Sequence, residues 1–362
     1  MMSLGARREL AEATRARYLA ADRRAKGRIL DEFVAATGYH RKYAITVLRR
    51  RPAQRQPRRR GGARKYSGNL VAALENVWRI AGCACGKRLV SFLPDLVEAL
   101  ERHGELALDS HTRQLLLEVS PATADRLLAK AREREPQHGR ATTKPGTLLK
   151  ASIPVRTFAQ WDDFRPGFFE VDLVAHCGES TRGEYLHSLD MVDISTRWVE
   201  LVALPNRGQA AVTAAIRQAQ ARLPFALLGL DSDNGAEFIN ANLVRYCREQ
   251  AITFTRCRPY RKNDQAYVEQ KNWTAIRQTV GYDRYEGEVC CRALEALYDP
   301  LRLYLNFFFP VMVLVSKSRD GAKVTRHYDR AQTPYQRVLA SAHVSDEAKD
   351  LLRATYLSLN PA

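Results

Sequence analysis

The sequence predicts an α/β protein in which a mixed five-stranded sheet with flanking helices is preceded by all-helical modules. Up to about residue 135 the apolar residues recur at helical spacing, and from about residue 150 they form short strand-like runs. Strands are expected at 168–175, 184–192, 198–204, 225–230 and 252–257, and helices at 208–223, 240–250 and 264–279. Three consecutive strands, a helical crossover, and then alternating strands and helices describe a mixed sheet covered by helices.

Proline, glycine and charge runs divide the chain into parts. Two segments rich in these residues exclude a packed core and are expected to be linkers. The expected parts are a helix-turn-helix module (1–52), a basic linker (53–67), a second helical, helix-turn-helix-like module (68–135), a linker (136–150), a core domain (151–285) and a C-terminal helical and β extension (286–362).

The charge distribution indicates the class of partner. The 362 residues are 45% apolar, which is enough for a packed core, and their net charge is +17. Residues 1–65 hold 19 Lys or Arg and 5 Asp or Glu, so most of the excess lies in the first fifth of the chain. A basic N-terminal module favours a polyanion partner, most simply double-stranded DNA. A solvated basic tail is the alternative.

The cysteines and apolar runs predict a cytoplasmic protein, associated with the nucleoid when bound to DNA. Seven cysteines without a preceding signal peptide are expected to be reduced thiols. The longest apolar run, 307–315, is too short to span a bilayer, so no membrane partner is expected. We expect this run to be buried core or an oligomer contact.

The first helical module has the outline of a helix-turn-helix. Gly38 separates two segments of helical spacing, and the second is basic. In such a motif the start of the second helix reaches base edges, and flanking basic residues lie near phosphates. The residues placed in these roles are Tyr39, His40, Arg41, Lys42, Arg49 and Arg50, with Arg58, Arg59 and Arg60 of the linker along phosphates or in a minor groove. The alternatives are a helical hairpin that only packs and a linker that is a solvated tether.

Three acidic residues lie where a carboxylate is costly unless it binds something. Asp172 is in the first strand, Asp233 is in the turn after the fourth, and Glu269 is on the next helix after 35 intervening residues. Three carboxylates that converge provide the oxygen ligands that Mg²⁺ prefers. Asp231, beside the turn, and Glu170, on the strand face of Asp172 by alternation, are the runners-up.

This arrangement resembles the catalytic core shared by retroviral integrases and many insertion-sequence transposases, the DDE family of the RNase H-like fold. The matching parts are the strand that ends near Asp172, the Asp-Asn-Gly-x-Glu-Phe turn that begins at Asp233, and the helix that carries Glu269. The His/Cys zinc module of retroviral integrases has no counterpart in this sequence.

The resemblance implies a DNA transposase, a polynucleotidyl transferase. It implies cutting at the ends of a mobile element and joining of the freed 3′ ends to target DNA, with Asp172, Asp233 and Glu269 as catalytic residues and metal ligands. Two Mg²⁺ ions per active site, with Mn²⁺ as a substitute, suit attack on a phosphodiester. Because two DNA ends must meet, a homodimer or higher oligomer on DNA is expected. The alternatives are a stand-alone metal-dependent nuclease of the same fold and a DNA-binding regulator with an inactive core.

Basic and amide residues near the acids are expected to hold the DNA backbone. They are Arg261 and Lys262 in the loop before the Glu269 helix, and Lys271, Asn272 and Arg277 on that helix. Solvation at the surface is the alternative for each basic residue.

Other polar residues receive weaker assignments. Asp190 and Asp193 are expected to be an edge residue and a turn residue. In the second helical module, Thr123, Asp125 and Arg126 lead a helix that either contacts DNA or only packs.

Overall fold

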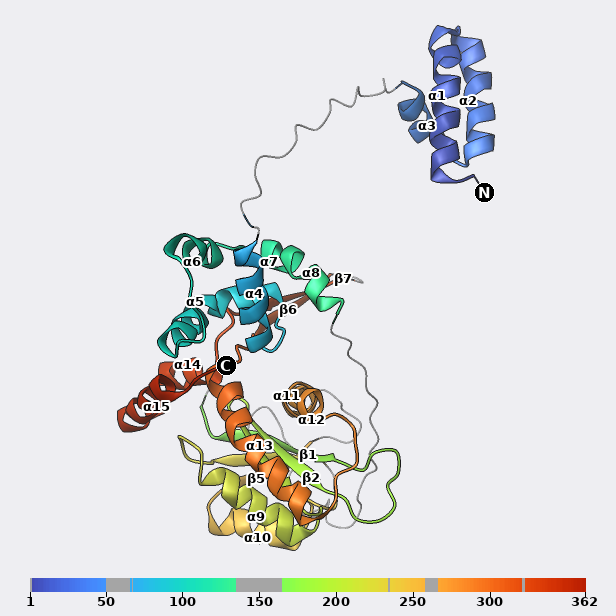
Figure 1. Cartoon of the computed structure of the whole chain (residues 1–362). Coiled ribbons are helices and arrows are strands. Elements are labelled where there is room, and N and C mark those ends of the chain that lie inside the picture. The colour runs from blue at the N-terminus through green and yellow to red at the C-terminus, as the bar shows by residue number, and fades with distance from the viewer. Residues whose placement is uncertain are drawn as a thin grey trace. The chain divides into compact units, whose positions relative to one another are not determined.

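The structure is a computed structural model that describes residues 2–49, 66, 68–134, 165–233, 235–257, 266–320 and 323–362. It divides into two compact units, Met1–Lys65 and Tyr66–Ala362, which are described separately (Figure 1). In the described part of the chain no helix is both long enough and apolar enough to cross a membrane.

The first unit is a three-helix module. Its helices are α1 (Leu4–Ala20), α2 (Arg23–Thr37) and α3 (Arg41–Arg49). The Asp22 side chain accepts a hydrogen bond from the Ala25 N–H and so begins α2. Gly38, with φ of 70°, ends α2 in the left-handed conformation that glycine adopts without strain. Phe33, Ala44 and Leu48 are buried among the helices, so this unit has a core of its own.

The second unit is built on a five-stranded sheet in the order β3-β2-β1-β4-β5. The strands are β1 (Phe168–Ala175), β2 (His187–Asp193), β3 (Val199–Leu204), β4 (Gly229–Ser232) and β5 (Thr253–Arg256). The first three pair antiparallel, and β1, β4 and β5 pair parallel. The predicted mixed sheet is confirmed, with β1 at its centre.

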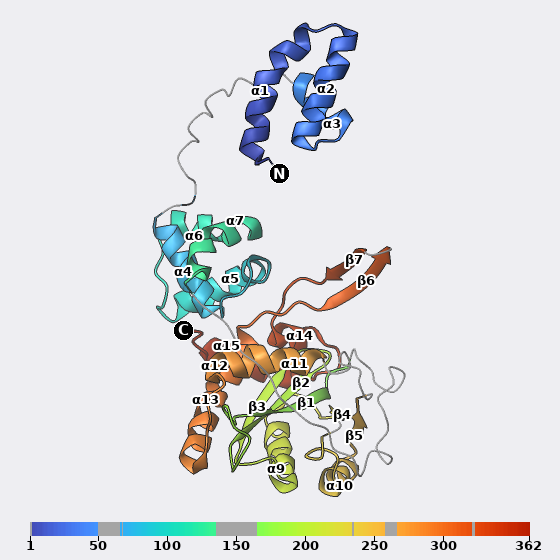
Figure 2. The same cartoon turned by 90° about the vertical axis from the view of Figure 1, so that its right-hand side faces the viewer.

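Helices cover both faces of this sheet (Figure 2). The helices α9 (Gln209–Gln220) and α10 (Ala241–Glu249) pack with the sheet in one apolar cluster. The opposite face is covered by α11 (Ala266–Lys271), the π-helical turn η2 (Asn272–Arg277), α12 (Gln278–Val280) and α13 (Gly287–Phe307). The sheet is therefore the middle of three layers, which is the RNase H-like arrangement.

The fourth strand lies further along the chain than the sequence predicted. The expected strand 225–230 is observed at 229–232, where it pairs with β1. Phe225 lies outside the strand and stacks on Phe169, with ring centroids 6.1 Å apart. Gly229, the first residue of the strand, leaves no room for a side chain, since a Cβ there would approach the Phe168 ring to 2.5 Å. Tertiary packing thus shifted an apolar run that local pattern assigns to a strand.

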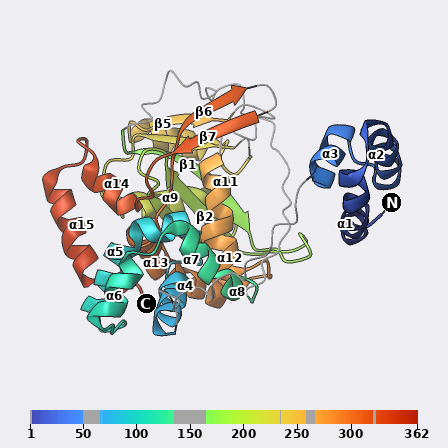
Figure 3. The same ribbon diagram turned by 90° about the horizontal axis from the view of Figure 1, so that it is seen from above.

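The helices before and after the sheet share one core (Figure 3). They are α4 (Asn69–Ile80), α5 (Gly86–Arg102), α6 (Ser110–Leu117), α7 (Pro121–Leu127), α8 (Ala129–Arg132), α14 (Pro334–Ala340) and α15 (Asp346–Ser358). Trp78, Phe307 and Tyr335 belong to the same buried cluster. The segment expected as a second module therefore lies within one compact unit with the sheet.

The leading face of α7 is used for packing. The Gly86 N–H at the start of α5 donates to Asp125 Oδ1 at 2.8 Å, and Arg132 donates to the same oxygen at 2.7 Å. Arg126 donates to Thr123 Oγ1 on its own helix. These contacts favour the packing alternative for this helix.

A two-stranded hairpin projects from the body of this unit (Figure 2). Its strands are β6 (Leu314–Asp320) and β7 (Lys323–Tyr328). This hairpin lies in the C-terminal extension (286–362), where β structure was expected.

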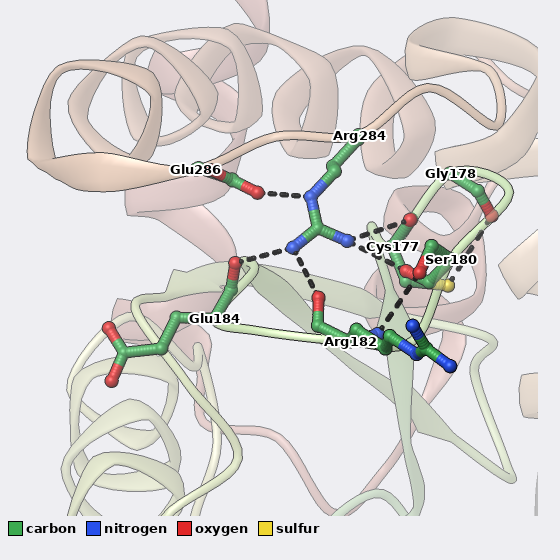
Figure 4. Close-up of polar contacts among 7 residues, drawn as sticks. All are labelled: Cys177, Gly178, Ser180, Arg182, Glu184, Arg284 and Glu286. Atoms are coloured by element: carbon green, nitrogen blue, oxygen red, sulfur yellow. Dashed lines mark hydrogen bonds and ion pairs between the residues drawn. The ribbon is translucent and has the colours of Figure 1, made fainter.

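One arginine holds the connection between β1 and β2 (Figure 4). Both terminal nitrogens of Arg284 donate to backbone carbonyls, and its Nε pairs with a carboxylate. The carbonyls are those of Cys177, Ser180, Arg182 and Glu184, and the carboxylate is that of Glu286. Because a guanidinium offers five donors in a fixed plane, this single side chain fixes the loop against the segment before α13.

Candidate active site

Parallel pairing of β1 and β4 brings Asp172 and Asp233 side by side. In the register of β1 and β4, Val171 lies opposite Ser232. The next residue along each chain segment is an aspartate, so the parallel register places Asp172 and Asp233 next to each other. The Gly235 N–H donates to Asp233 Oδ1 at 2.7 Å, which orients this carboxylate in its turn.

A buried carboxylate on the same strand fixes the helix of Glu269. Glu170 is 1% exposed, and its Oε2 accepts hydrogen bonds from the N–H groups of Tyr267 and Val268, at 3.0 and 3.1 Å. A carboxylate at a helix start satisfies donors that lack helical partners and complements the helix dipole. Glu170 therefore anchors α11 over β1 and brings the exposed Glu269 toward Asp172.

The three carboxylates interact electrostatically at Asp172. Burial, and then the negative charges of Asp233 and Glu269, raise the pKa of Asp172 to about 7. Hydrogen bonds oppose this shift: Asn272 Nδ2 donates to Asp172 Oδ2 at 2.6 Å, and the Leu173 N–H donates to Oδ1 at 2.8 Å. Carboxylates that raise one another's pKa favour a bound cation, which removes the repulsion.

The donor set fits divalent ions by its chemistry. All three side chains offer oxygen, the ligand atom that Mg²⁺ and Mn²⁺ take. Within the described ranges, no three His, Cys, Asp or Glu side chains are gathered closely enough to surround an ion. One oxygen of Asp172 accepts a hydrogen bond from the Asn272 amide.

Two residues of the helix lie differently from the prediction. Lys271, expected to contact DNA at the surface, is 5% exposed and faces Asp190 and the Phe309 ring. Arg277 donates to the carbonyls of Ala175 and Gly281, so it ties the end of β1 to the end of the helix. Lys271 and Arg277 point inward because this helix is covered on several sides by other elements, which helical periodicity alone does not reveal.

Asp190 is also placed differently from its assignment as an edge residue. It lies on β2 directly opposite Asp172 and is fully buried, and burial raises its pKa well above the usual value. Asp193 is the turn residue that was expected, since its oxygens accept from Gly167 and Thr196. Glu170 was considered only as the runner-up to Asp172, not as the residue that anchors the helix, and Asp190 was not recognised as part of the site. Two signals were available: Glu170 alternates with Asp172 along β1, and Asp190 pairs opposite Asp172 on β2.

The first unit presents its basic residues on α3 and the turn before it. His40, Arg41, Lys42 and Arg49 are exposed, and Arg41 pairs with Asp31. Tyr39 instead packs edge-on against Phe33 and Tyr43. The exposed face of α3 and its preceding turn therefore carries the positive charge, while Tyr39 packs against neighbouring rings.

Several predicted contacts cannot be placed. Arg50, Arg58, Arg59, Arg60, Arg261 and Lys262 lie outside the described residues.

One family model and one relative match this chain. Residues 165–262 match the family model described as the integrase core domain. The uncharacterized protein y4rM of Sinorhizobium fredii is 44% identical over 337 residues, which cover 93% of this chain and 96% of that protein.

Two solved structures are similar over part of the chain. The catalytic core domain of BIV integrase is 21% identical and covers 49% of this chain and 96% of its own, with a TM-score of 0.33. The HTLV-2 integrase catalytic core domain, in a dimeric form with magnesium, is 16% identical and covers 41% and 93%, with a TM-score of 0.31.

The three-layer sheet and its acidic edge define an integrase-type DDE core. The chain belongs to the family of the rhizobial protein y4rM, and its integrase core domain spans residues 165–262.

Proposed function

We propose that the protein is a DNA transposase that cleaves phosphodiester bonds at the ends of a mobile element and joins the freed ends to target DNA. The observation that carries the proposal is that Asp172 lies within electrostatic range of both Asp233 and Glu269: burial, and then these two negative charges, raise its pKa to about 7. Such repulsion destabilises the protein without a cation and favours binding of one.

In this proposal Asp172, Asp233 and Glu269 hold two divalent ions, Mg²⁺ or Mn²⁺. Divalent ions in such sites activate a water or a DNA 3′-hydroxyl and stabilise the leaving oxygen. Asp172 lies on the central strand and interacts electrostatically with both other carboxylates, so it is the candidate to serve both ions. Its binding of a cation would require loss of its proton.

Neighbouring residues position these ligands. Glu170 holds the start of α11 through two backbone N–H groups, so it sets the distance of Glu269 from the sheet. The Gly235 N–H donates to one oxygen of Asp233 and so orients this carboxylate. Small displacements of such ligands are costly for catalysis, because reacting groups must be aligned.

The first unit supplies DNA binding in this proposal. The exposed His40, Arg41, Lys42 and Arg49 lie on one helix and the turn before it, as expected for a helix that enters a major groove. The active form is a homodimer or larger assembly, because two element ends must be held together. Association with the nucleoid follows from binding to DNA.

The test is a strand-transfer assay with the DNA that flanks the gene. Inverted repeats in that DNA would serve as labelled substrates, with Mg²⁺ or Mn²⁺ and a target plasmid. We expect joined products from the wild type and none from Asp172→Asn, Asp233→Asn or Glu269→Gln, with repeat binding retained in all three. Joining by any of these variants at the wild-type rate would remove that residue from the site.

The same assay separates the alternatives. A stand-alone nuclease would cut DNA of any sequence and join nothing. A regulator with an inactive core would bind the repeats without metal-dependent cutting. Mass measurement of the complex with paired ends that found one protomer would refute the proposed assembly.

A further inference from the structure

A second cavity lies on α11 away from the carboxylates. It has a volume of about 440 Å³, and its wall is formed by α5, the turn after β2, α11, η2, the segment after α13 and β7. Asp172, Asp233 and Glu269 do not line it. The cavity is therefore separate from the candidate active site, although both use the same helix.

Three cations from three separate segments meet at this cavity. They are Arg88 of α5, Arg197 of the turn after β2 and Lys271 of α11. Arg197 is 7% exposed and Lys271 is 5% exposed. Burial lowers the pKa of Lys271 to about 7; Asp190 opposes this shift, and the charges of Arg88 and Arg197 add to it, so the three basic groups lie within electrostatic range of one another. Like charges that are gathered and covered in this way destabilise the fold unless an anion joins them.

Each cation keeps a hydrogen-bond donor without an acceptor. Among the described residues, Arg88 Nη2, Arg197 Nη1 and Lys271 Nζ are buried and have no partner. A buried donor without a partner costs about 1–3 kcal/mol, and more when it is charged. These donors therefore need a ligand that accepts several hydrogen bonds at once.

Aromatic rings fix the cations but do not satisfy these donors. The Arg197 guanidinium lies 3.6 Å from the centroid of the Tyr267 ring, and the Arg88 guanidinium lies 4.4 Å from that of Phe309. Lys271 Nζ lies 5.3 Å from the same Phe309 ring. Stacking on a ring uses the face of a guanidinium and leaves its N–H edge available.

The nearby acids do not balance this charge. Asp190 faces Lys271, but it is a single carboxylate that also faces Asp172, and its two oxygens accept no hydrogen bond within the described ranges. Asp193 faces Arg197, but its oxygens are occupied by the N–H of Gly167 and by Thr196. The three cations thus outnumber the acids available to them.

We propose that this cavity binds the phosphate group of a nucleotide, with Arg88, Arg197 and Lys271 as its ligands. A phosphate accepts several hydrogen bonds and matches the planar fork of arginine. The volume exceeds that of phosphate alone, and the rings of Tyr267 and Tyr328 on the wall suit stacking of a base. The nucleotide is either a free molecule or the end of a DNA strand, because both present the same group.

The experiment measures the melting temperature of the full-length protein in phosphate-free buffer with a chelator, which removes divalent ions from the carboxylates. The probes are inorganic phosphate, dAMP and deoxyadenosine at equal ionic strength. We expect dAMP to raise the melting temperature by about 3 °C at concentrations well above its Kd, and deoxyadenosine to leave it unchanged. Inorganic phosphate should give a smaller rise than dAMP, because it lacks the base.

Variants show whether the cavity is responsible. Lys271→Met keeps the length of the side chain and should abolish the rise, and Arg88→Gln provides a second test if that variant folds poorly. Lys349→Met is the matched control, since Lys349 is also largely covered but pairs with Asp346 on α15. It should respond like the wild type. No rise in the wild type, or an equal rise in Lys271→Met and Arg88→Gln, would overturn the proposal.

A final probe distinguishes the two sources of the phosphate. A short 5′-phosphorylated oligothymidylate that stabilises the wild type more than dAMP, through the same residues, identifies a DNA strand. Stabilisation by dAMP alone identifies a free nucleotide. Both results support the phosphate pocket, and neither depends on activity at the carboxylates.

Discussion

Replacing Asp172 by asparagine should stabilise the metal-free protein at high pH. Burial, and then the negative charges of Asp233 and Glu269, raise the pKa of Asp172 from 3.8 to about 7. A carboxyl whose pKa is raised on folding binds its proton more tightly in the folded state. Its favourable contribution is therefore complete below pH 3.8 and is lost as the pH rises through 7. Asparagine resembles the protonated form and does not incur this loss.

The size of the effect follows from the shift. About 3 pKa units correspond to roughly 4 kcal/mol at 1.36 kcal/mol per unit. Asp172 is partly exposed, so solvent screening reduces this to about 2 kcal/mol. For a chain of this length the melting temperature of Asp172→Asn should exceed that of the wild type by about 4 °C at pH 8. The difference should shrink toward pH 5.

The assay is thermal unfolding followed by circular dichroism between pH 5 and pH 8, with a chelator present. Asp283→Asn, at an exposed aspartate, is the matched control and should show no such trend. Added Mn²⁺ should then reverse the order, since it stabilises the wild type and not the variant. A variant that is no more stable than the wild type at pH 8 would refute the argument that the carboxylates repel one another.

Further predictions concern the residues around these ligands. Glu170→Ala should lower the free energy of unfolding by about 1–2 kcal/mol and reduce strand transfer, because two N–H groups at the start of α11 lose their acceptor; unchanged unfolding in urea would contradict this role. Asn272→Ala removes a hydrogen bond that lowers the pKa of Asp172, so the pH at which half of the protein binds Mn²⁺ should rise. Calorimetric titration between pH 6 and pH 8 measures this pH, and a fall in it would contradict the role of Asn272. Arg284→Lys should lower the free energy of unfolding by about 2–3 kcal/mol, because an ammonium cannot reach four carbonyls and a carboxylate together. Proteolysis within residues 177–184 should become faster. An unaltered rate of proteolysis would argue against the role of Arg284 in holding this loop.

Local pattern determined much of the fold because strands and helices differ in period. Strand β1 was predicted with its observed bounds, 168–175. The order of three strands, a crossover helix and further strands predicted the mixed sheet. Asp172, Asp233 and Glu269 were predicted as the site by position and spacing, because a carboxylate at the end of an apolar strand needs a partner, and they stay a prediction.

Pairing and packing decided what local pattern does not carry. The strand before Asp233 lies several residues further along the chain than predicted. Phe225 packs on Phe169 outside the strand, and Gly229 lies against the Phe168 ring. The segment 68–135 packs in the same compact unit as the sheet, because its apolar residues belong to a cluster whose members lie far apart in sequence.

The largest differences concern charge. Glu170 became a helix anchor, and Lys271 became a buried group beside Arg88 and Arg197. Periodicity gives the face of a helix on which a charge lies, but not what covers that face. Only the tertiary structure brings three cations from distant segments to one cavity, because the free energy of a charge depends on neighbours that are remote in sequence.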